Sequence, residues 1–155
     1  VTLEPLRAAR EELLTSARPP ADTLRELTLL TLRFFDANRG TYRVLLWERH
    51  HELVHRSRRQ ASPAYRGLVA QVAGVLAAGV RSGAFRPLDT RRVAALVVEA
   101  NTAFVAERLF HDSPGPVEAD ADLLMDLLLH GLAARPRRAP RAPAPPASPT
   151  RSKKS

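Results

Sequence analysis

Apolar residues recur along the chain at the spacing of amphipathic helices, and the alternating pattern of strands is almost absent. Helix-breaking and capping residues divide this pattern into segments. Pro19-Pro20 ends the first, Asp22 can cap the second, Gly40 breaks it, and Ser62-Pro63 starts the fourth. The expected helices are 2–17, 22–38, 41–59, 63–83, 89–111 and 117–134. The sequence therefore predicts an all-α domain of about six helices.

The last two expected helices are more apolar than one buried face requires. Helix 117–134 has leucines around about two-thirds of its circumference, and helix 89–111 has two separate apolar stripes. One interpretation is a dimer interface, in which two helices from each subunit pack together across a two-fold axis; the other is a central helix enclosed in a monomer. We favour the homodimer, with these interface residues: Val98, Val105, Leu109, Leu124, Leu127 and Leu128.

The bulk composition excludes several classes of protein. The 155 residues suffice for one domain with a core, and the chain has no cysteine, which excludes disulfides, thiolate metal sites and cysteine nucleophiles. No apolar run reaches membrane-spanning length, and the first residues lack the layout of a secretory signal. We expect a cytoplasmic protein without a membrane partner and without a cofactor.

The net charge of +8 is concentrated at the C-terminus. Seven of the 24 basic residues lie in 135–155, a segment without acidic residues, so residues 1–134 carry 17 basic and 16 acidic side chains. Because 135–155 also contains six prolines and no large apolar side chain, we predict a folded domain over 1–134 followed by a disordered basic tail. The tail is interpreted either as a solubilising extension or as a loose arm for DNA or another polyanion.

The segment 83–89, GAFRPLD, has a specific arrangement of helix-ending and helix-starting residues. We expect Gly83 to end one helix, Phe85 to pack back on the core, Pro87 to prevent continuation and Asp89 to cap the next helix. With its flanking helices and the stretches 34–48 and 123–135, this segment resembles the C-terminal ligand-binding domain of TetR/AcrR-family transcriptional regulators. The resemblance covers about residues 1–134.

The resemblance implies a dimeric regulatory domain that senses a small-molecule effector and has no enzyme activity. Members of the family bind DNA through an N-terminal helix-turn-helix, which would precede residue 1. DNA binding is therefore expected only through a module outside this sequence. The chain is expected to be a fragment of a regulator, a truncated product or a stand-alone relative.

The resemblance also implies that the effector lies among the middle helices, where the sequence offers Phe34, Trp47, His50, Tyr65 and Asn101 as ligand-binding residues. Asn101 lies between the two apolar stripes, and a buried amide needs hydrogen-bond partners. These partners are either a ligand or the backbone and a partner helix, and His50 equally fits a core histidine. Such an aromatic and aliphatic lining would suit an apolar or aromatic small molecule.

The motif His51-Glu52-x-x-His55 matches the five-residue helical signature of zinc peptidases. A zinc-dependent hydrolase is thus one alternative function. Longer zinc patterns are not matched, because Arg58 and Ala61 stand where a glycine and a third histidine are required. The two histidines also fall at the margin of the inward helix face, so we interpret the motif as a coincidence and predict no metal. A plain helical interaction module is the second alternative.

Overall fold

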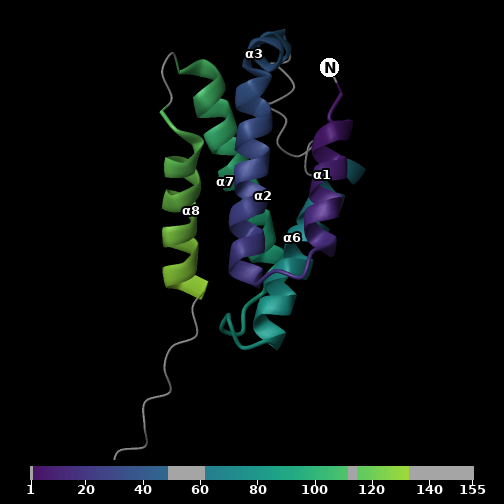
Figure 1. Ribbon diagram of the computed structural model, residues 1–155, viewed down its shortest axis with the longest axis vertical. Coiled ribbons are helices and arrows are strands. Elements are labelled where there is room, and N and C mark those ends of the chain that lie inside the picture. The colour runs from purple at the N-terminus through teal and green to yellow at the C-terminus, as the bar shows by residue number, and fades with distance from the viewer. Residues whose placement is uncertain (1, 49–61, 112–114, 133–155) are drawn as a thin grey trace, which may run out of the picture.

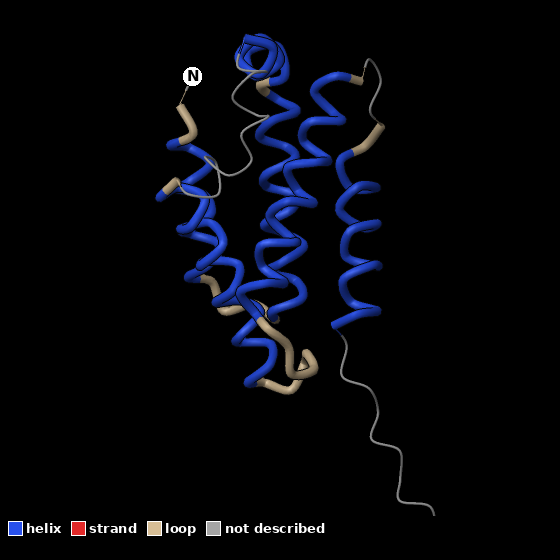
Figure 2. The backbone as a smooth tube through the Cα atoms, turned by 180° about the vertical axis from the view of Figure 1, so that it is seen from behind, coloured by secondary structure: helices blue, strands red, loops and turns tan. Residues whose placement is uncertain are grey.

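The computed structural model describes residues 2–48, 62–111 and 115–132, apart from the side chains of 45–48 and 132. In these residues the chain forms six helices and no strand, which confirms the predicted all-α class (Figures 1 and 2). None of the helices is both long and apolar enough to cross a membrane. The predicted tail, 135–155, lies outside the described residues. The helices are α1 (Glu4–Thr15), α2 (Pro20–Ala37), α3 (Arg39–Glu48), α6 (Pro63–Arg81), α7 (Thr90–Phe110) and α8 (Val117–Leu132).

The predicted helix-starting and helix-ending residues around α6 and α7 are confirmed. The Ser62 side chain accepts a hydrogen bond from the backbone N–H of Tyr65 at 3.1 Å, and the Asp89 carboxylate accepts one from that of Arg92 at 3.1 Å. Each bond satisfies a backbone donor that the first turn of the helix leaves unpaired. After α6, Gly83 takes a left-handed φ of 78°, a conformation that favours glycine.

Two predicted boundaries are wrong. α2 begins at Pro20, so Asp22 lies in the first turn and is not the cap. The fixed φ of proline suits the first helical position, and an acidic residue in the first turn interacts favourably with the helix dipole. The break between α2 and α3 falls at Asn38, whose side-chain amide donates to Phe34 O at 2.8 Å, whereas Gly40 lies inside α3. Of the predicted third helix, 41–59, the structure describes the part up to residue 48.

The helices form a bundle in which α2 and α7 run in one direction and α1, α6 and α8 run in the other (Figure 1). α7 packs against α6, α2 and α3, while α2 also packs against α1 and α8. α3 crosses one end of the bundle, here called the α3 end, and the 82–89 turn between α6 and α7 forms the opposite end, here called the turn end.

The buried core divides into two clusters along the bundle, and α7 contributes to both. The cluster toward the turn end contains Leu24, Leu27, Val69, Val72, Val75, Leu76, Phe85, Ala94, Val97, Val98, Leu124 and Met125. The cluster toward the α3 end contains Leu29, Leu32, Tyr42, Val105, Leu109, Val117 and Ala121. Both apolar stripes of α7 are therefore covered within one subunit, as expected for a central helix with neighbours on several sides.

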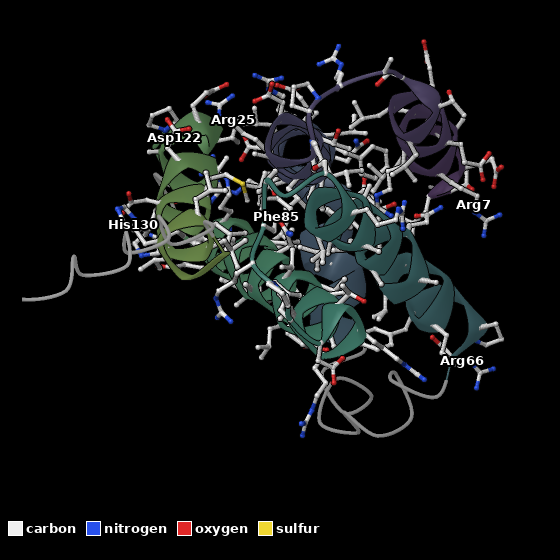
Figure 3. All side chains as sticks on the ribbon, turned by 90° about the horizontal axis from the view of Figure 1, so that it is seen from below. Arg7, Arg25, Arg66, Phe85, Asp122 and His130 are labelled. Carbon is white, nitrogen blue, oxygen red and sulfur yellow. The ribbon has the colours of Figure 1, made fainter. Side chains whose placement is uncertain are left out.

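The turn end is closed by a contact between Phe85 and Gly79. The Phe85 ring is buried over Gly79, where an added methyl group would overlap it. The backbone N–H of Phe85 also donates to Gly79 O at 3.0 Å. Viewed from this end, Phe85 lies in the middle of the bundle (Figure 3), so the structure confirms that it packs back on the core.

Candidate functional site

The predicted ligand-binding residues that the structure describes do not all pack against the same core cluster. Phe34 packs against the cluster toward the α3 end, and Tyr65, in the first turn of α6, packs against the cluster toward the turn end. Asn101 lies on α7. The side chain of Trp47, in α3, and all of His50 lie outside the described residues. This residue set stays a prediction, and Asn101 is the member with the most informative surroundings.

Two polar side chains occupy the boundary between the core clusters, on α2 and α7. On α2, Leu27 belongs to the cluster toward the turn end and Leu29 to the cluster toward the α3 end. Thr28 lies between these two leucines in the sequence, and its side chain has 0% exposure. On α7, Asn101 lies between Val98, of the cluster toward the turn end, and Val105, of the cluster toward the α3 end. The two side chains therefore lie at the same level of adjacent helices.

Each of these side chains has a buried oxygen that is not satisfied by the described residues. The Thr28 hydroxyl oxygen and the Asn101 amide oxygen are both buried and have no hydrogen-bond partner there. The Asn101 amide nitrogen donates to Val97 O at 3.1 Å, so only its acceptor is left over. Buried polar groups of folded proteins are normally paired, and exceptions mark places that call for a functional explanation.

Arg10 lies beside this level, at the contact between α1 and α2. Its Nη2 donates to the Thr31 hydroxyl at 3.2 Å, and that hydroxyl donates in turn to Leu27 O at 2.8 Å. Burial lowers the pKa of Arg10, because the charged form loses hydration. Among the residues that the structure describes, no carboxylate forms an ion pair with this guanidinium.

Arg108, near the end of α7, has the opposite environment. It is buried, and its guanidinium pairs with Asp120 at 2.6 Å and with Asp36 at 3.3 Å. It also donates to Gly115 O at 2.8 Å. These bonds join α2, α7, α8 and the chain segment before α8, so Arg108 has a structural role. Arg108 was not among the residues predicted from the sequence to have a role.

Aromatic side chains pack together at the α3 end. The ring centroids of Phe35 and Tyr42 are 4.8 Å apart in an edge-on arrangement, and those of Phe34 and Phe35 are 5.5 Å apart. The Tyr42 hydroxyl is buried without a hydrogen-bond partner in the described residues, and burial raises its pKa. This cluster supplies an apolar and aromatic surface on α2 and α3.

Exposed ion pairs attach α8 to α2. Arg25 and Asp122 point toward one another (Figure 3), with 2.7 Å between Nη2 and Oδ1, and Arg33 pairs with Glu118 at 2.8 Å. The hydrogen bond from Arg33 lowers the pKa of Glu118, and the hydrogen bond to Asp122 raises the pKa of Arg25. Because these pairs are solvent-exposed, each contributes little to the free energy of unfolding.

The structure buries most of the predicted dimer interface inside the subunit. The buried residues are Val98, Val105, Leu109 and Leu124. Leu128 is partly buried against the first cluster, while Leu127 is exposed to 66%. The physical reason is the central position of α7, whose second apolar stripe meets helices of its own chain. The predicted surplus of apolar surface lies on other side chains of α7 and α8: Leu96 (68% exposed), Phe110 (42%) and Leu123 (52%).

A shallow cleft of about 270 Å³ lies between α1 and α2, on their outer side. Its lining includes two acidic and two basic side chains, and none of the predicted ligand-binding residues reaches it. The lining consists of Ala9, Glu12, Leu13, Ser16, Arg18, Glu26, Leu30 and Arg33. The opposite charges leave this cleft without a marked preference for either sign of ligand.

The described part of the chain contains no group of side chains that indicates a metal site. Across 2–48, 62–111 and 115–132, no three histidine, cysteine, aspartate or glutamate side chains are grouped so that they could hold a metal ion. His51 and His55, the pair of the zinc-like motif, lie outside these ranges.

Comparisons with known proteins agree with this architecture. Residues 20–112, more than half of the chain, match the family model described as "Tetracyclin repressor-like, C-terminal domain". The fold is similar to the structure of the ketosteroid transcriptional regulator KstR2 of Mycobacterium tuberculosis, with a TM-score of 0.62 and 17% identity over 86% of this chain and 68% of that one. No match was found among curated proteins. The chain therefore belongs to the tetracyclin repressor-like C-terminal domains of TetR-family transcriptional regulators, and it is a regulatory domain, not an enzyme.

Proposed function

We propose that this chain is the effector-sensing and dimerising domain of a TetR-like transcriptional regulator. The effector is a small molecule with an apolar or aromatic body, and it binds among the middle helices at the level of Asn101. Phe34, Trp47, His50 and Tyr65 remain the further candidates for its lining.

The observation that carries the effector site is the pair of unsatisfied oxygens on Thr28 and Asn101. Leaving a buried acceptor or hydroxyl unpaired costs about 1–3 kcal/mol, which an apolar residue of the same shape would avoid. A ligand that donates to the Asn101 amide oxygen offsets this cost in the bound state. The surrounding clusters supply the apolar contacts that such a ligand needs.

N-Phenyl-1-naphthylamine, an uncharged aromatic fluorophore with one N–H donor, tests this site. Saturable binding to the 155-residue chain is expected, measured by fluorescence titration. Asn101→Leu should weaken binding by about tenfold, because the complex loses the hydrogen bond to the amide oxygen. The melting temperature should stay close to that of the wild type, because the bond lost from the ligand-free chain is the one within α7 to Val97 O, and the unsatisfied oxygen is removed with it. A protein that does not bind the probe, or a variant that unfolds without a change in affinity, would contradict the assignment.

Dimerisation is proposed through the exposed apolar side chains of α7 and α8. Leu123 and Leu127 are one turn apart on α8, and Leu96 and Phe110, fourteen residues apart, share one side of α7. Apolar side chains exposed on neighbouring helices are typical of a subunit interface. A two-fold pairing of α7 and α8 would cover all four.

Sedimentation velocity distinguishes this interface from a monomer. We expect a dimer for the wild type and a monomer for Leu127→Glu, because a carboxylate at the interface is buried without a partner. Val44→Glu is the matched control: Val44 is exposed to 57% on α3, so the variant should remain dimeric. A wild-type chain that stays monomeric at high concentration would refute the interface, and a dimer that binds no probe would favour the plain interaction module.

A further inference from the structure

Arg10 differs from the arginines of the described chain that form ion pairs. Arg7, Arg25 and Arg33 each pair with a carboxylate at the surface, and the buried Arg108 pairs with two. Arg10 is half-buried, and its partner is the neutral Thr31 hydroxyl. One positive charge in the α1–α2 contact is therefore not balanced by an acidic residue of the described chain.

The position of Arg10 on α1 directs it into the bundle. Leu6 is buried, and Leu13 and Leu14 pack against the core, so these residues define the inward face of α1. Arg10 lies one turn from each of them and belongs to the same face. Arg7, in contrast, points outward (Figure 3).

The hydrogen-bonding groups beside Arg10 continue toward the proposed effector site. Thr31, its partner, lies one turn after Thr28 on α2, and side chains three apart on a helix are neighbours. The unsatisfied hydroxyl of Thr28, at the level of Asn101, thus lies one helical turn from the Arg10–Thr31 contact. Positive charge and unpaired hydrogen-bonding groups occur together in this part of the bundle.

We propose that Arg10 recognises an anionic group of the effector, which is therefore an organic monoanion with an apolar body. This inference rests on the proposed function. A guanidinium has five N–H donors in a planar fork, and the bond to Thr31 leaves donors free for a carboxylate or sulfonate. One negative charge balances the one unpaired positive charge. A doubly charged phosphate would leave an excess negative charge in a partly desolvated site.

This role predicts that Arg10 does not stabilise the ligand-free fold. A half-buried cation without an acid loses hydration and gains only one neutral hydrogen bond, so an apolar side chain of similar length suits the position better. Arg10→Met should therefore leave the melting temperature of the ligand-free chain unchanged or raise it. An arginine needed for packing or for folding would give a lower melting temperature instead.

Two fluorophores that differ by one sulfonate test the proposal. 1-Anilinonaphthalene-8-sulfonate has the aromatic body of N-phenyl-1-naphthylamine plus a single negative charge. The wild type should bind the sulfonate about tenfold or more tightly than the neutral compound, since bonds to charged groups are the stronger ones. Arg10→Gln should abolish this preference, and Arg7→Gln, the exposed control on the same helix, should retain it. Displacement by 1-naphthoate but not by 1-naphthyl phosphate would establish the preference for one charge.

The outcomes separate this inference from the function on which it rests. If the wild type binds the neutral fluorophore as tightly as the sulfonate, the effector site stands and the role of Arg10 is refuted. A preference that Arg10→Gln keeps, or that Arg7→Gln also loses, refutes the role as well. If neither fluorophore binds, the effector site itself is refuted.

Discussion

The buried side chains at the two ends of the bundle and those in its middle differ in how well the rest of the chain supplies their contacts and bonding partners. At the α3 end, Arg108 is enclosed by carboxylates and a carbonyl oxygen, and at the turn end Phe85 fills the space above Gly79. In the middle, the described residues leave the Thr28 hydroxyl without a hydrogen-bond partner and the Arg10 charge without an acid. The buried charge at the α3 end thus has carboxylate partners, although the Tyr42 hydroxyl there is also unsatisfied in the described residues, whereas the charge in the middle has none. This difference is expected where binding, and not stability, determines the residue.

The largest loss of stability is expected from removing the buried Arg108 guanidinium at the α3 end. Arg108→Met leaves Asp36 and Asp120 without their cation, and we expect the free energy of unfolding to fall by about 3 kcal/mol. Urea denaturation followed by circular dichroism measures this loss. Arg33→Met is the control, because it removes an exposed ion pair and should change the free energy of unfolding much less. Equal losses in the two variants would show that Arg108 is not a structural centre.

A smaller loss is expected at the turn end. Gly79→Ala places a methyl group against the Phe85 ring, which must shift, and overpacking of this kind costs about 1–3 kcal/mol. Gly74→Ala, in the same helix but with no atom near the added methyl, should instead stabilise by about 0.5–1 kcal/mol through helix propensity. Thermal denaturation of both variants checks the opposite signs. A stabilised Gly79→Ala would mean that the ring does not lie where the structure places it.

A substitution in the middle of the bundle should raise the free energy of unfolding, whereas the substitutions at the two ends lower it. Thr28→Val removes an unsatisfied hydroxyl and keeps the shape of the side chain, so we expect the free energy of unfolding to rise by up to about 1 kcal/mol. Thr23→Val is the matched variant on the same helix: its hydroxyl donates to Pro19 O at 3.1 Å, and losing that bond should destabilise by about 1 kcal/mol. If both variants are destabilised alike, Thr28 has a partner that matters for folding.

The smallest effect concerns the surface between α2 and α8 and depends on pH. The hydrogen bond from Arg33 lowers the pKa of Glu118 in the folded chain, so this pair stabilises the fold above the ordinary glutamate value of 4.5. The contribution is lost as the pH falls through the lowered pKa. Urea denaturation at pH 7 and at pH 3 measures the difference in the free energy of unfolding between these two pH values. This difference should be slightly larger in the wild type than in Glu118→Gln or Arg33→Gln. The double variant should behave like either single one.

Features that depend on neighbours in the sequence were predictable. The caps at Ser62 and Asp89, the helix end at Gly83 and the inward position of Phe85 all follow from residues within a few positions of one another. The family resemblance, which rested on the 83–89 segment with its flanking helices and on the stretches 34–48 and 123–135, was confirmed by the family match over residues 20–112. There are two exceptions. At the start of α2, two competing local signals, Pro20 and Asp22, lie two residues apart, and the break between α2 and α3 falls at Asn38 and not at Gly40.

Features that depend on distant residues were not predictable. Arg108 pairs with an aspartate 72 residues away, and Arg10 bonds to a threonine 21 residues away. The sequence does contain a signal for both, since each arginine occurs on an otherwise inward-facing stripe of its helix. The second apolar stripe of α7 was assigned to another subunit because helical periodicity reveals an apolar face without revealing which helix covers it.

The attachment of α8 has a consequence for the solution conditions of any experiment on this domain. Apart from its buried stripe, α8 is held by arginines of other elements: Arg25, Arg33, Arg108 and Arg86, the last donating from Nε to Gly131 O at 2.6 Å. Dissolved salt screens the exposed members of this set, whereas the apolar contacts between α6 and α7 are not screened. A rise in ionic strength therefore weakens the attachment of α8 more than the packing of α6 on α7. Because α8 carries the exposed Leu123 and Leu127, salt also affects any surface that these two leucines contact.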